Sequence, residues 1–180
     1  MLIKAQESTL LVIDIQERLF PAIEDNTTLA EHSAWLIQVA KRIGVPVLFT
    51  EQYSKGLGPT IASLRDGIAD EAIIEKLQFS AARDGALFNR PGGERKQFII
   101  SGTETHICVL QTVIDLLARG NQVFVVEEAV GSRRASDKAL GLARMQQAGA
   151  SIVSREMVAF EWMEQAGTEL FRSISREFIR

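Results

Sequence analysis

A buried strand that turns directly into an amphipathic helix is predicted for residues 98–117, FIISGTETHICVLQTVIDLL. The apolar run at 98–101 has the composition of a strand that is covered on both faces, as in parallel sheets. Apolar residues then recur at helical spacing from 107 to 117, and Gly120 follows the last turn, as glycine commonly does at helix ends. A short polar connection therefore joins a buried strand to a covering helix.

The same alternation of strand and helix extends over the rest of the chain. Short runs rich in Val, Ile and Phe occur at 10–14, 45–50, 73–75, 123–126 and 152–154, and amphipathic helical spacing occurs at 29–43 and 135–145. Strands that alternate with helices indicate βαβ units and a parallel sheet. The predicted fold class is α/β, a three-layer α/β/α arrangement with a mainly parallel sheet.

Length and composition limit the class of protein. The chain has 180 residues with no Pro-, Ser- or Gly-rich boundary, so we expect one domain over 1–180. A net charge of −3, with Arg133 and Arg134 as the only dense basic cluster, argues against nucleic acid as a partner. No apolar run is long enough for a membrane span or a signal peptide, so we expect a cytoplasmic protein without membrane contact.

Sequence motifs for bound groups are missing. There is no G-x-G-x-x-G, no Walker-type phosphate loop and no G-x-S-x-G elbow. His32 and His106 lack partners at metal-site spacing, and Cys108 is the single cysteine, so we expect no metal, no cofactor and no internal disulfide. The segment 55–60, KGLGPT, is interpreted as a turn or as a lid over a pocket.

Chemistry-bearing residues gather at the carboxyl ends of the predicted strands, where open parallel sheets place their ligand sites. These residues are Asp14, Thr50, Glu51, Lys76, the segment 102–108, Glu127 and Glu128.

Cys108 lies in the first turn predicted after the strand 98–101, where the helix dipole favours a thiolate. Lys76 ends the strand 73–75, and a nearby cation lowers the pKa of a thiol. Asp14 ends the strand 10–14 and is suited to accept the thiol proton. We therefore predict a thiol pKa below about 8.5, the ordinary value. The alternatives are a buried apolar cysteine, a solvated lysine and a helix-capping aspartate.

Three groups of segments resemble the isochorismatase-like cysteine hydrolases. They are 11–16 (LVIDIQ), Glu75 and Lys76 followed by Phe79 and Ser80, and 102–109 (GTETHICV). The segments 50–53 (TEQY), 55–60 and 108–112 (CVLQT) are most similar to the isochorismatase domain-containing subgroup. The resemblance extends over most of the chain in the same order.

The resemblance implies an isochorismatase-like hydrolase fold and a triad in which Asp14 is the general base, Lys76 the electrostatic partner and Cys108 the nucleophile. It also implies a cis peptide bond between Thr103 and Glu104. Backbone N–H groups of that turn and of Cys108 would then form an oxyanion hole. Homo-oligomerisation is a further implication.

Two departures restrict what the resemblance implies. Nicotinamidases of this superfamily carry an Asp and His metal cluster after the second strand, whereas this chain has Glu51, Gln52 and Tyr53 there. Isochorismatases proper lack the nucleophilic cysteine, whereas this chain has Cys108. The family name therefore does not define the reaction.

The leading interpretation is a metal-independent hydrolase of a small amide or ester that forms an acyl-Cys108 intermediate. Hydrolysis of a vinyl ether, with Asp14 as the acid, is the second interpretation, and a non-catalytic protein that binds a partner is the third. The expected pocket-lining residues are Phe20, Gln52, Tyr53, Leu57 and Phe79.

Overall fold

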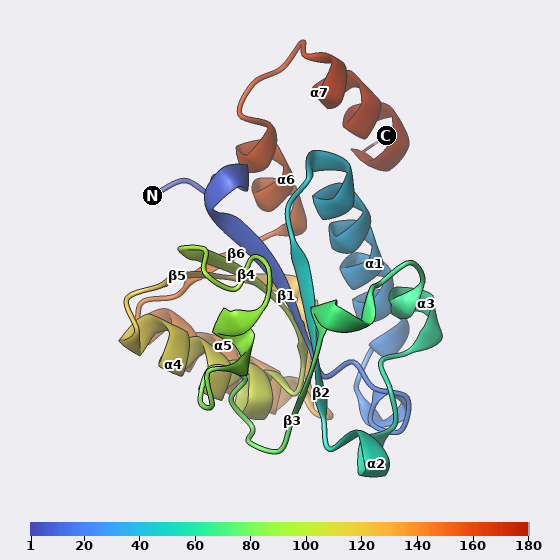
Figure 1. Cartoon of the computed structure of the whole chain (residues 1–180), viewed down its shortest axis with the longest axis vertical. Coiled ribbons are helices and arrows are strands. Elements are labelled where there is room, and N and C mark those ends of the chain that lie inside the picture. The colour runs from blue at the N-terminus through green and yellow to red at the C-terminus, as the bar shows by residue number, and fades with distance from the viewer. Residues whose placement is uncertain (180) are drawn as a thin grey trace.

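The structure, a computed structural model, describes residues 1–179. Figure 1 shows a central sheet with helices on both sides. The strands are β1 (Ser8–Ile13), β2 (Val47–Gln52), β3 (Ile73–Lys76), β4 (Gln97–Thr103), β5 (Gln122–Gly131) and β6 (Ser151–Val153). The α-helices are α1 (Asn26–Ile43), α2 (Ser54–Leu57), α3 (Ala62–Arg65), α4 (Leu110–Ala118), α5 (Ala135–Gln147), α6 (Arg155–Met163) and α7 (Glu169–Ile174).

Shorter helical turns connect these elements. The 3-10 turns are η1 (Ala5–Glu7), η2 (Phe20–Ala22), η3 (Asp70–Ala72) and η4 (Ala86–Asn89), and the π-helical turns are η5 (Thr105–Val109) and η6 (Ser175–Ile179). Gly44, at φ +89°, closes α1 by donating its N–H to the carbonyl of Ala40. Each predicted strand and helix is present. The main difference lies in β5, which continues past the predicted end at residue 126 as far as Gly131.

The six strands form one parallel sheet in the order β3-β2-β1-β4-β5-β6. The chain moves outward from β1 to β2 and β3, then returns to the other side of β1 to form β4, β5 and β6. The order of the strands therefore reverses between β1 and β4. In open α/β sheets, ligands bind beyond the carboxyl ends of the strands at such a point.

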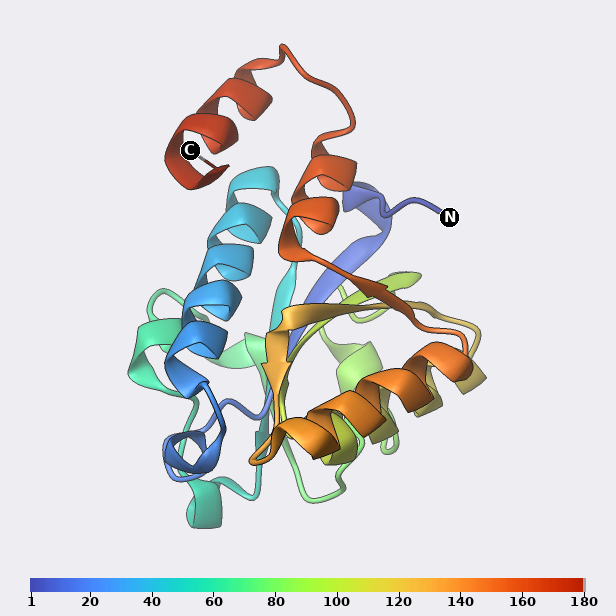
Figure 2. The same cartoon turned by 180° about the vertical axis from the view of Figure 1, so that it is seen from behind.

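Two hydrophobic cores cover the two faces of the sheet, as expected for strands that are apolar throughout. On one face α1 and α6 pack against β1, β2 and β5 through residues such as Leu36, Phe49 and Trp162. On the other face α4 and α5 pack against β4 and β5 through residues such as Val113 and Met145. Figure 2 shows α1 and α6 separated by the sheet from α5. The three-layer α/β/α prediction is confirmed.

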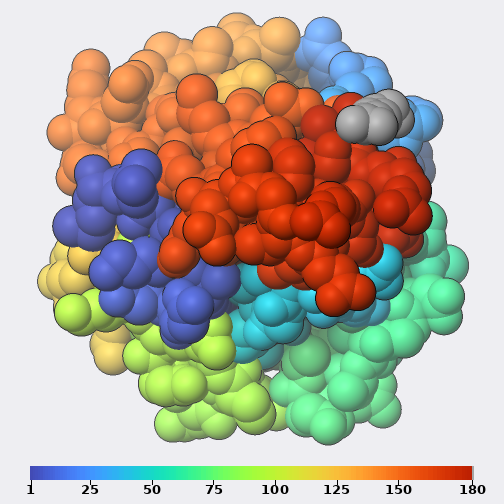
Figure 3. All heavy atoms as spheres, turned by 90° about the horizontal axis from the view of Figure 1, so that it is seen from above, coloured from blue at the N-terminus to red at the C-terminus, as the bar shows by residue number. Residues whose placement is uncertain are grey.

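The N-terminal segment lies beside α6. The backbone N–H of Ile3 donates to Glu161 Oε2 at 2.6 Å, and Figure 3 shows the N-terminal segment lying beside the C-terminal helices. Within residues 1–179, no helix is both long enough and apolar enough to cross a membrane.

Candidate active site

Asp14 immediately follows β1 and is held by both neighbouring strands. Its backbone N–H donates to the carbonyl of Thr50 in β2 at 3.1 Å, and its own carbonyl accepts from Thr103 Oγ1 of β4 at 2.6 Å. The residue adopts a left-handed backbone conformation with φ +51°, which aspartate tolerates better than most residues. These contacts fix the direction in which the buried carboxylate leaves the sheet.

The carboxylate of Asp14 forms an ion pair with Lys76. Lys76 Nζ lies 2.7 Å from Asp14 Oδ2, and both side chains are almost completely buried. A buried ion pair is stable only when further hydrogen bonds satisfy both charges. Thr50 Oγ1 donates to Asp14 Oδ1 at 2.6 Å, which satisfies the second carboxylate oxygen.

Lys76 is surrounded by acceptors in the part of the chain that the structure describes. Besides Asp14, Nζ donates to Gln52 Oε1 at 2.7 Å, to the Phe79 carbonyl at 3.0 Å and to the Gln78 carbonyl at 3.3 Å. An ammonium has three N–H donors, fewer than these acceptors. The N–H donors of Lys76 are therefore all used within the protein, and a hydrogen bond to a ligand would displace one of these partners.

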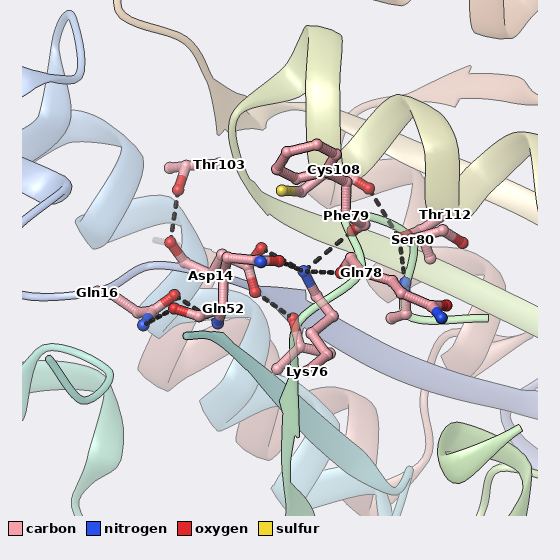
Figure 4. Close-up of polar contacts among 12 residues, drawn as sticks. Asp14, Gln16, Gln52, Lys76, Gln78, Phe79, Ser80, Thr103, Cys108 and Thr112 are labelled. Atoms are coloured by element: carbon pink, nitrogen blue, oxygen red, sulfur yellow. Dashed lines mark hydrogen bonds and ion pairs between the residues drawn. The ribbon is translucent and has the colours of Figure 1, made fainter. Parts of the chain in front are cut away.

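Cys108 lies in the π-helical turn η5, which leads directly into α4, and its side chain is buried with 7% exposure. Its carbonyl accepts from Thr112 Oγ1 at 2.7 Å, and Thr112 Oγ1 accepts from the backbone N–H of Ala81 at 3.0 Å. The turn that carries the thiol is thereby joined to the segment after β3. Figure 4 shows the side chains of Asp14, Lys76 and Cys108 converging from three elements.

The predicted low pKa of the thiol is wrong. Burial raises the pKa of Cys108 well above its ordinary value, and the negative charge of Asp14 raises it further. Lys76 acts in the opposite direction but is outweighed. The sequence places the thiol at the start of a helix, but it does not reveal how deeply the thiol is buried. The thiol is therefore protonated at neutral pH, with a carboxylate near it.

The predicted cis peptide bond between Thr103 and Glu104 is also wrong, because every peptide bond in residues 1–179 is trans. Gly102, which has φ +142°, lies within β4 where the pairing with β5 shifts register, and the chain then continues into η5. The Glu104 side chain pairs with Arg133 Nε and accepts from the Arg133 backbone N–H at 3.1 Å. Its carboxylate thus supports the segment after β5.

The depression beside Lys76 has a volume of about 620 Å³ and is lined by Tyr53, Lys55, Glu75, Lys76, Leu77, Gln78 and Asp84. Two expected pocket residues lie at this edge, since Tyr53 lines the depression and the Phe79 carbonyl contacts Lys76. Both side chains are about half exposed, Tyr53 at 52% and Phe79 at 53%. Gln52 contacts the ion pair directly, a role that its prediction as a pocket residue did not include.

The other two expected pocket residues lie elsewhere. Phe20 lines a separate depression beside α1, formed with Thr27, Ala30, Glu31, Ala34 and Ser63. Leu57 lies in α2, where its carbonyl accepts from the backbone N–H of Arg18 at 3.0 Å. Gln16 Nε2 also donates to the Gly58 carbonyl at 2.7 Å. The segment considered as a lid is thereby tied to the segment that follows Asp14.

Three carboxylates expected at strand ends bind partners other than Asp14, Lys76 and Cys108. Glu51 accepts from the backbone N–H and the hydroxyl of Thr60 at 2.7 and 2.9 Å. Glu127 pairs with Lys138 at 2.9 Å, and Glu128 accepts from the backbone N–H of Arg155 at 2.7 Å. The two β5 residues fall within the strand because it continues beyond its predicted end.

In the described residues, no group of three or more His, Cys, Asp and Glu side chains is arranged to hold a metal ion. Gln52 lies in the segment where the nicotinamidases of this superfamily carry metal ligands. Here its side-chain oxygen accepts a hydrogen bond from Lys76 Nζ. Fold and site together define a three-layer α/β protein with a thiol, a carboxylate and an ammonium at the reversal point of its sheet.

Residues 8–157 match the family model described as the isochorismatase domain. The chain belongs to the isochorismatase family of hydrolases, and the resemblance read from the sequence is confirmed. It is 35% identical over 173 residues to isochorismatase domain-containing protein 2A of Mus musculus, an alignment that covers 95% of this chain and 82% of the relative.

Solved structures share the fold. A structure described as the MAR1 ribonuclease of Caenorhabditis elegans superposes with a TM-score of 0.89 and 32% identity, covering 100% of this chain and 93% of that one. The YcaC gene product of Escherichia coli, described as an octameric hydrolase of unknown specificity, gives a TM-score of 0.88 at 23% identity. That comparison covers 99% of this chain and 91% of that one, and it shows the fold alone.

Proposed function

We propose that the protein is a metal-independent cysteine hydrolase of a small amide or ester, with Cys108 as nucleophile, Asp14 as general base and Lys76 as electrostatic partner. The observation that carries the proposal is the buried 2.7 Å ion pair between Asp14 and Lys76, whose charges both act on the Cys108 thiol. An ion pair that only stabilised the fold would not need a thiol beside it. A nucleophile, by contrast, needs a proton acceptor and a group that stabilises that acceptor.

The raised pKa of the thiol determines how the first step proceeds. Cys108 Sγ attacks the carbonyl carbon while Asp14 takes the thiol proton, because the thiol is not ionised beforehand. The C–N or C–O bond then breaks, Asp14 returns the proton to the departing amine or alcohol, and a thioester remains on Cys108. Backbone N–H groups of Thr103, Glu104 and Cys108 are the candidates for an oxyanion hole, which requires donors aimed at the developing charge.

Water completes the cycle. Asp14 takes a proton from a water molecule while the oxygen of that water attacks the carbonyl carbon of the thioester. The C–S bond breaks, the carboxylic acid leaves, and the proton held by Asp14 returns to the sulfur. Each turnover thus consumes one water and leaves the three side chains in their starting states. Throughout the cycle Lys76 holds a positive charge at hydrogen-bond distance from the Asp14 carboxylate.

The test uses p-nitrophenyl acetate and a panel of small amides and esters, with quenched samples examined by mass spectrometry. We expect an acetyl group on Cys108 of the wild-type protein, and no turnover in Cys108→Ala. Asp14→Asn should slow acylation by about 10²- to 10⁴-fold with poor leaving groups, the usual contribution of a general base. It should retain more acylation with the activated ester, whose leaving group needs no proton. Turnover that survives in Cys108→Ala would contradict the proposal.

The raised thiol pKa favours a second candidate, hydrolysis of a vinyl ether with Asp14 as the acid and the thiol as a bystander. This reaction needs no thiolate. It predicts the reverse pattern on its own substrate: near-normal turnover in Cys108→Ala and none in Asp14→Asn. Absence of any adduct or turnover over the whole panel would instead favour the third interpretation, a non-catalytic protein that binds a partner.

We further propose a homo-oligomer located in the cytoplasm that acts on small molecules and binds neither nucleic acid nor membrane. The octameric description of YcaC and the 74% exposure of Leu77 beside the depression support association. The name of the C. elegans relative raises RNA as a substrate for that protein. The net charge of −3 argues against a phosphate-binding surface here. Incubation of structured and single-stranded RNA with the protein should give no cleavage that depends on Cys108.

A further inference from the structure

Strand β2 lies between the two strands that carry the ion pair. Asp14 follows β1, Lys76 ends β3, and the strand order is β3-β2-β1, so the salt bridge passes over the carboxyl end of β2. Thr50 and Gln52 are two residues apart at this end, and alternate residues of a strand share a face. Each contacts one member of the pair: Thr50 donates to Asp14, and Gln52 accepts from Lys76.

The Gln52 amide is held in one orientation. Its Nε2 donates to the Leu77 carbonyl at 2.7 Å, so that Oε1 faces the ammonium of Lys76. The backbone of Gln52 is fixed in turn by the fully buried Gln16, whose Oε1 accepts from the Gln52 N–H at 2.8 Å. Gln16 Nε2 donates to the Gln52 carbonyl at 3.0 Å. Because hydrogen bonds fix both its backbone and its side-chain amide, Gln52 holds the ammonium of Lys76 in one position.

The hydroxyl of Thr50 has a comparable function on the other member of the pair. The residue is fully buried, and its single hydroxyl proton is donated to Asp14 Oδ1 at 2.6 Å. Lys76 donates to Oδ2, so each carboxylate oxygen receives one hydrogen bond from these two side chains. The carboxylate is thereby prevented from rotating, and each oxygen retains a lone pair for the proton of Cys108.

We propose that Thr50 and Gln52 are positioning residues of the hydrolytic site: Thr50 orients the general base Asp14, and Gln52 holds Lys76 in place. This inference rests on the proposed function, because it assigns these residues to the triad. In the described contacts neither side chain binds Cys108, so each acts through its partner. The proposal therefore predicts that substitution of Thr50 has no effect on Cys108 acylation when Asp14 is replaced. Likewise, substitution of Gln52 should have no effect when Lys76 is replaced.

The first experiment compares Thr50→Val with Thr50→Ser, using the rate at which p-nitrophenyl acetate acylates Cys108. Valine keeps the shape of threonine and loses the hydroxyl, whereas serine keeps the hydroxyl and loses a methyl group. We expect a 10- to 100-fold slower rate in Thr50→Val, about the loss for a hydrogen bond to a charged group, and a rate within about threefold of wild type in Thr50→Ser. A purely structural role in core packing predicts the opposite order.

Thr9→Val is the matched control for the loss of a buried hydroxyl. Thr9 is fully buried in β1, and its Oγ1 donates to the Gly92 carbonyl at 2.6 Å, the same length as the Thr50 bond. This variant should lose stability and keep the wild-type acylation rate. Equal rates in Thr50→Val and Thr50→Ser, or an equal loss in Thr9→Val, would overturn the assignment of Thr50.

The second experiment measures whether the effects depend on the partner. Gln52→Met should slow acylation about tenfold in the wild-type background and cause no further loss in Lys76→Met. Likewise, Thr50→Val should cause no further loss in Asp14→Asn. Residues that act through one another give such non-additive effects. Fully additive losses would show that Thr50 and Gln52 act independently of the ion pair, and the inference would then be wrong.

A readout without turnover separates this inference from the proposed function. The pH dependence of Cys108 alkylation by iodoacetamide reports the effect of Asp14 on the thiol, whether or not an ester is hydrolysed. The midpoint should move in Thr50→Val and stay at the wild-type value in Thr50→Ser. In the Asp14→Asn background, the addition of Thr50→Val should cause no further change in the midpoint. An unchanged midpoint in Thr50→Val overturns the positioning role. A missing acetyl adduct in wild type overturns only the proposed function.

Discussion

The thiol of Cys108 is the residue at which the chemistry of the site can be measured most directly. Burial and Asp14 raise its pKa, so alkylation by iodoacetamide should titrate with a midpoint above about 8.5, the ordinary value for a thiol. Asp14→Asn should lower the midpoint because it removes a negative charge, and Lys76→Met should raise it. The dependence of the alkylation rate on pH, followed from pH 6 to pH 11, compares the three proteins and shows whether the wild-type midpoint exceeds the ordinary value. A wild-type midpoint at or below the ordinary value would contradict the prediction.

The same pKa shift predicts how stability depends on pH. The folded state holds the thiol proton more tightly than the unfolded chain does, so its contribution is fully present below about pH 8.5. It is lost progressively as the pH rises from there toward the pKa of the folded state. Urea unfolding at pH 7, 8, 9 and 10 should show this alkaline loss in wild type. In Cys108→Ala the loss attributable to the thiol should be missing.

Removal of Lys76 alone should cost more stability than removal of both charges of the buried pair. Lys76→Met leaves the buried carboxylate of Asp14 without its charged partner, and loss of one partner of a buried pair costs about 3–5 kcal/mol. The double variant Asp14→Asn/Lys76→Met leaves no such charge and should be more stable than Lys76→Met alone. Urea denaturation at pH 7 measures both. A double variant that is less stable than Lys76→Met would contradict this explanation.

At the scale of elements, the end of β4 depends on close contact with β1. A Cβ atom at Gly102 would lie 2.3 Å from the Ile13 carbonyl oxygen, next to Asp14. Gly102→Ala should therefore destabilise the protein by about 1–3 kcal/mol more than Gly120→Ala. Gly120 also has a positive φ, +88°, but its Cβ would meet open space. It should also slow acylation of Cys108, because β1 must move. Equal unfolding free energies and equal acylation rates in the two variants would contradict this prediction.

At the scale of the whole molecule, we predict that activity needs no metal ion. The side chains around the thiol supply a proton acceptor and a positive charge without one. Ester hydrolysis should be unchanged after incubation with EDTA or 1,10-phenanthroline followed by gel filtration. A loss that zinc or iron restores would contradict the prediction, provided that Cys108 is shown to be unmodified by mass spectrometry.

The proposed association of chains determines the mass of the protein in solution. Light scattering during gel filtration should give a mass that is a multiple of the chain mass of 19.9 kDa. Leu77→Glu, which places a charge on a largely exposed apolar residue beside the depression, should reduce this mass if the surface is part of the contact. The matched control is Leu140→Glu, which changes a similarly exposed leucine on α5. A mass of 19.9 kDa for wild type would contradict association.

The sequence alone determined the layers of the molecule and the residues at the ends of its strands. Apolar runs without alternation require cover on both faces, and helices with one apolar face supply it. The run at 98–101 and the helical spacing after it therefore fixed a strand and a helix with Cys108 between them. The carboxyl ends of parallel strands meet at one edge, which explains why Asp14 and Lys76 could be grouped although 62 positions separate them.

Only the tertiary structure decided how these groups affect one another. The sign of the thiol pKa shift depends on depth of burial and on the balance of two nearby charges, and neither quantity is encoded in local sequence. The backbone conformation of Gly102 near the end of β4 depends on the approach of β1 to β4. The contacts of Thr50 and Gln52 exist because β2 lies between β1 and β3, and strand order results from long-range packing. Local propensity cannot specify such distances, because they arise from packing between segments far apart in the chain.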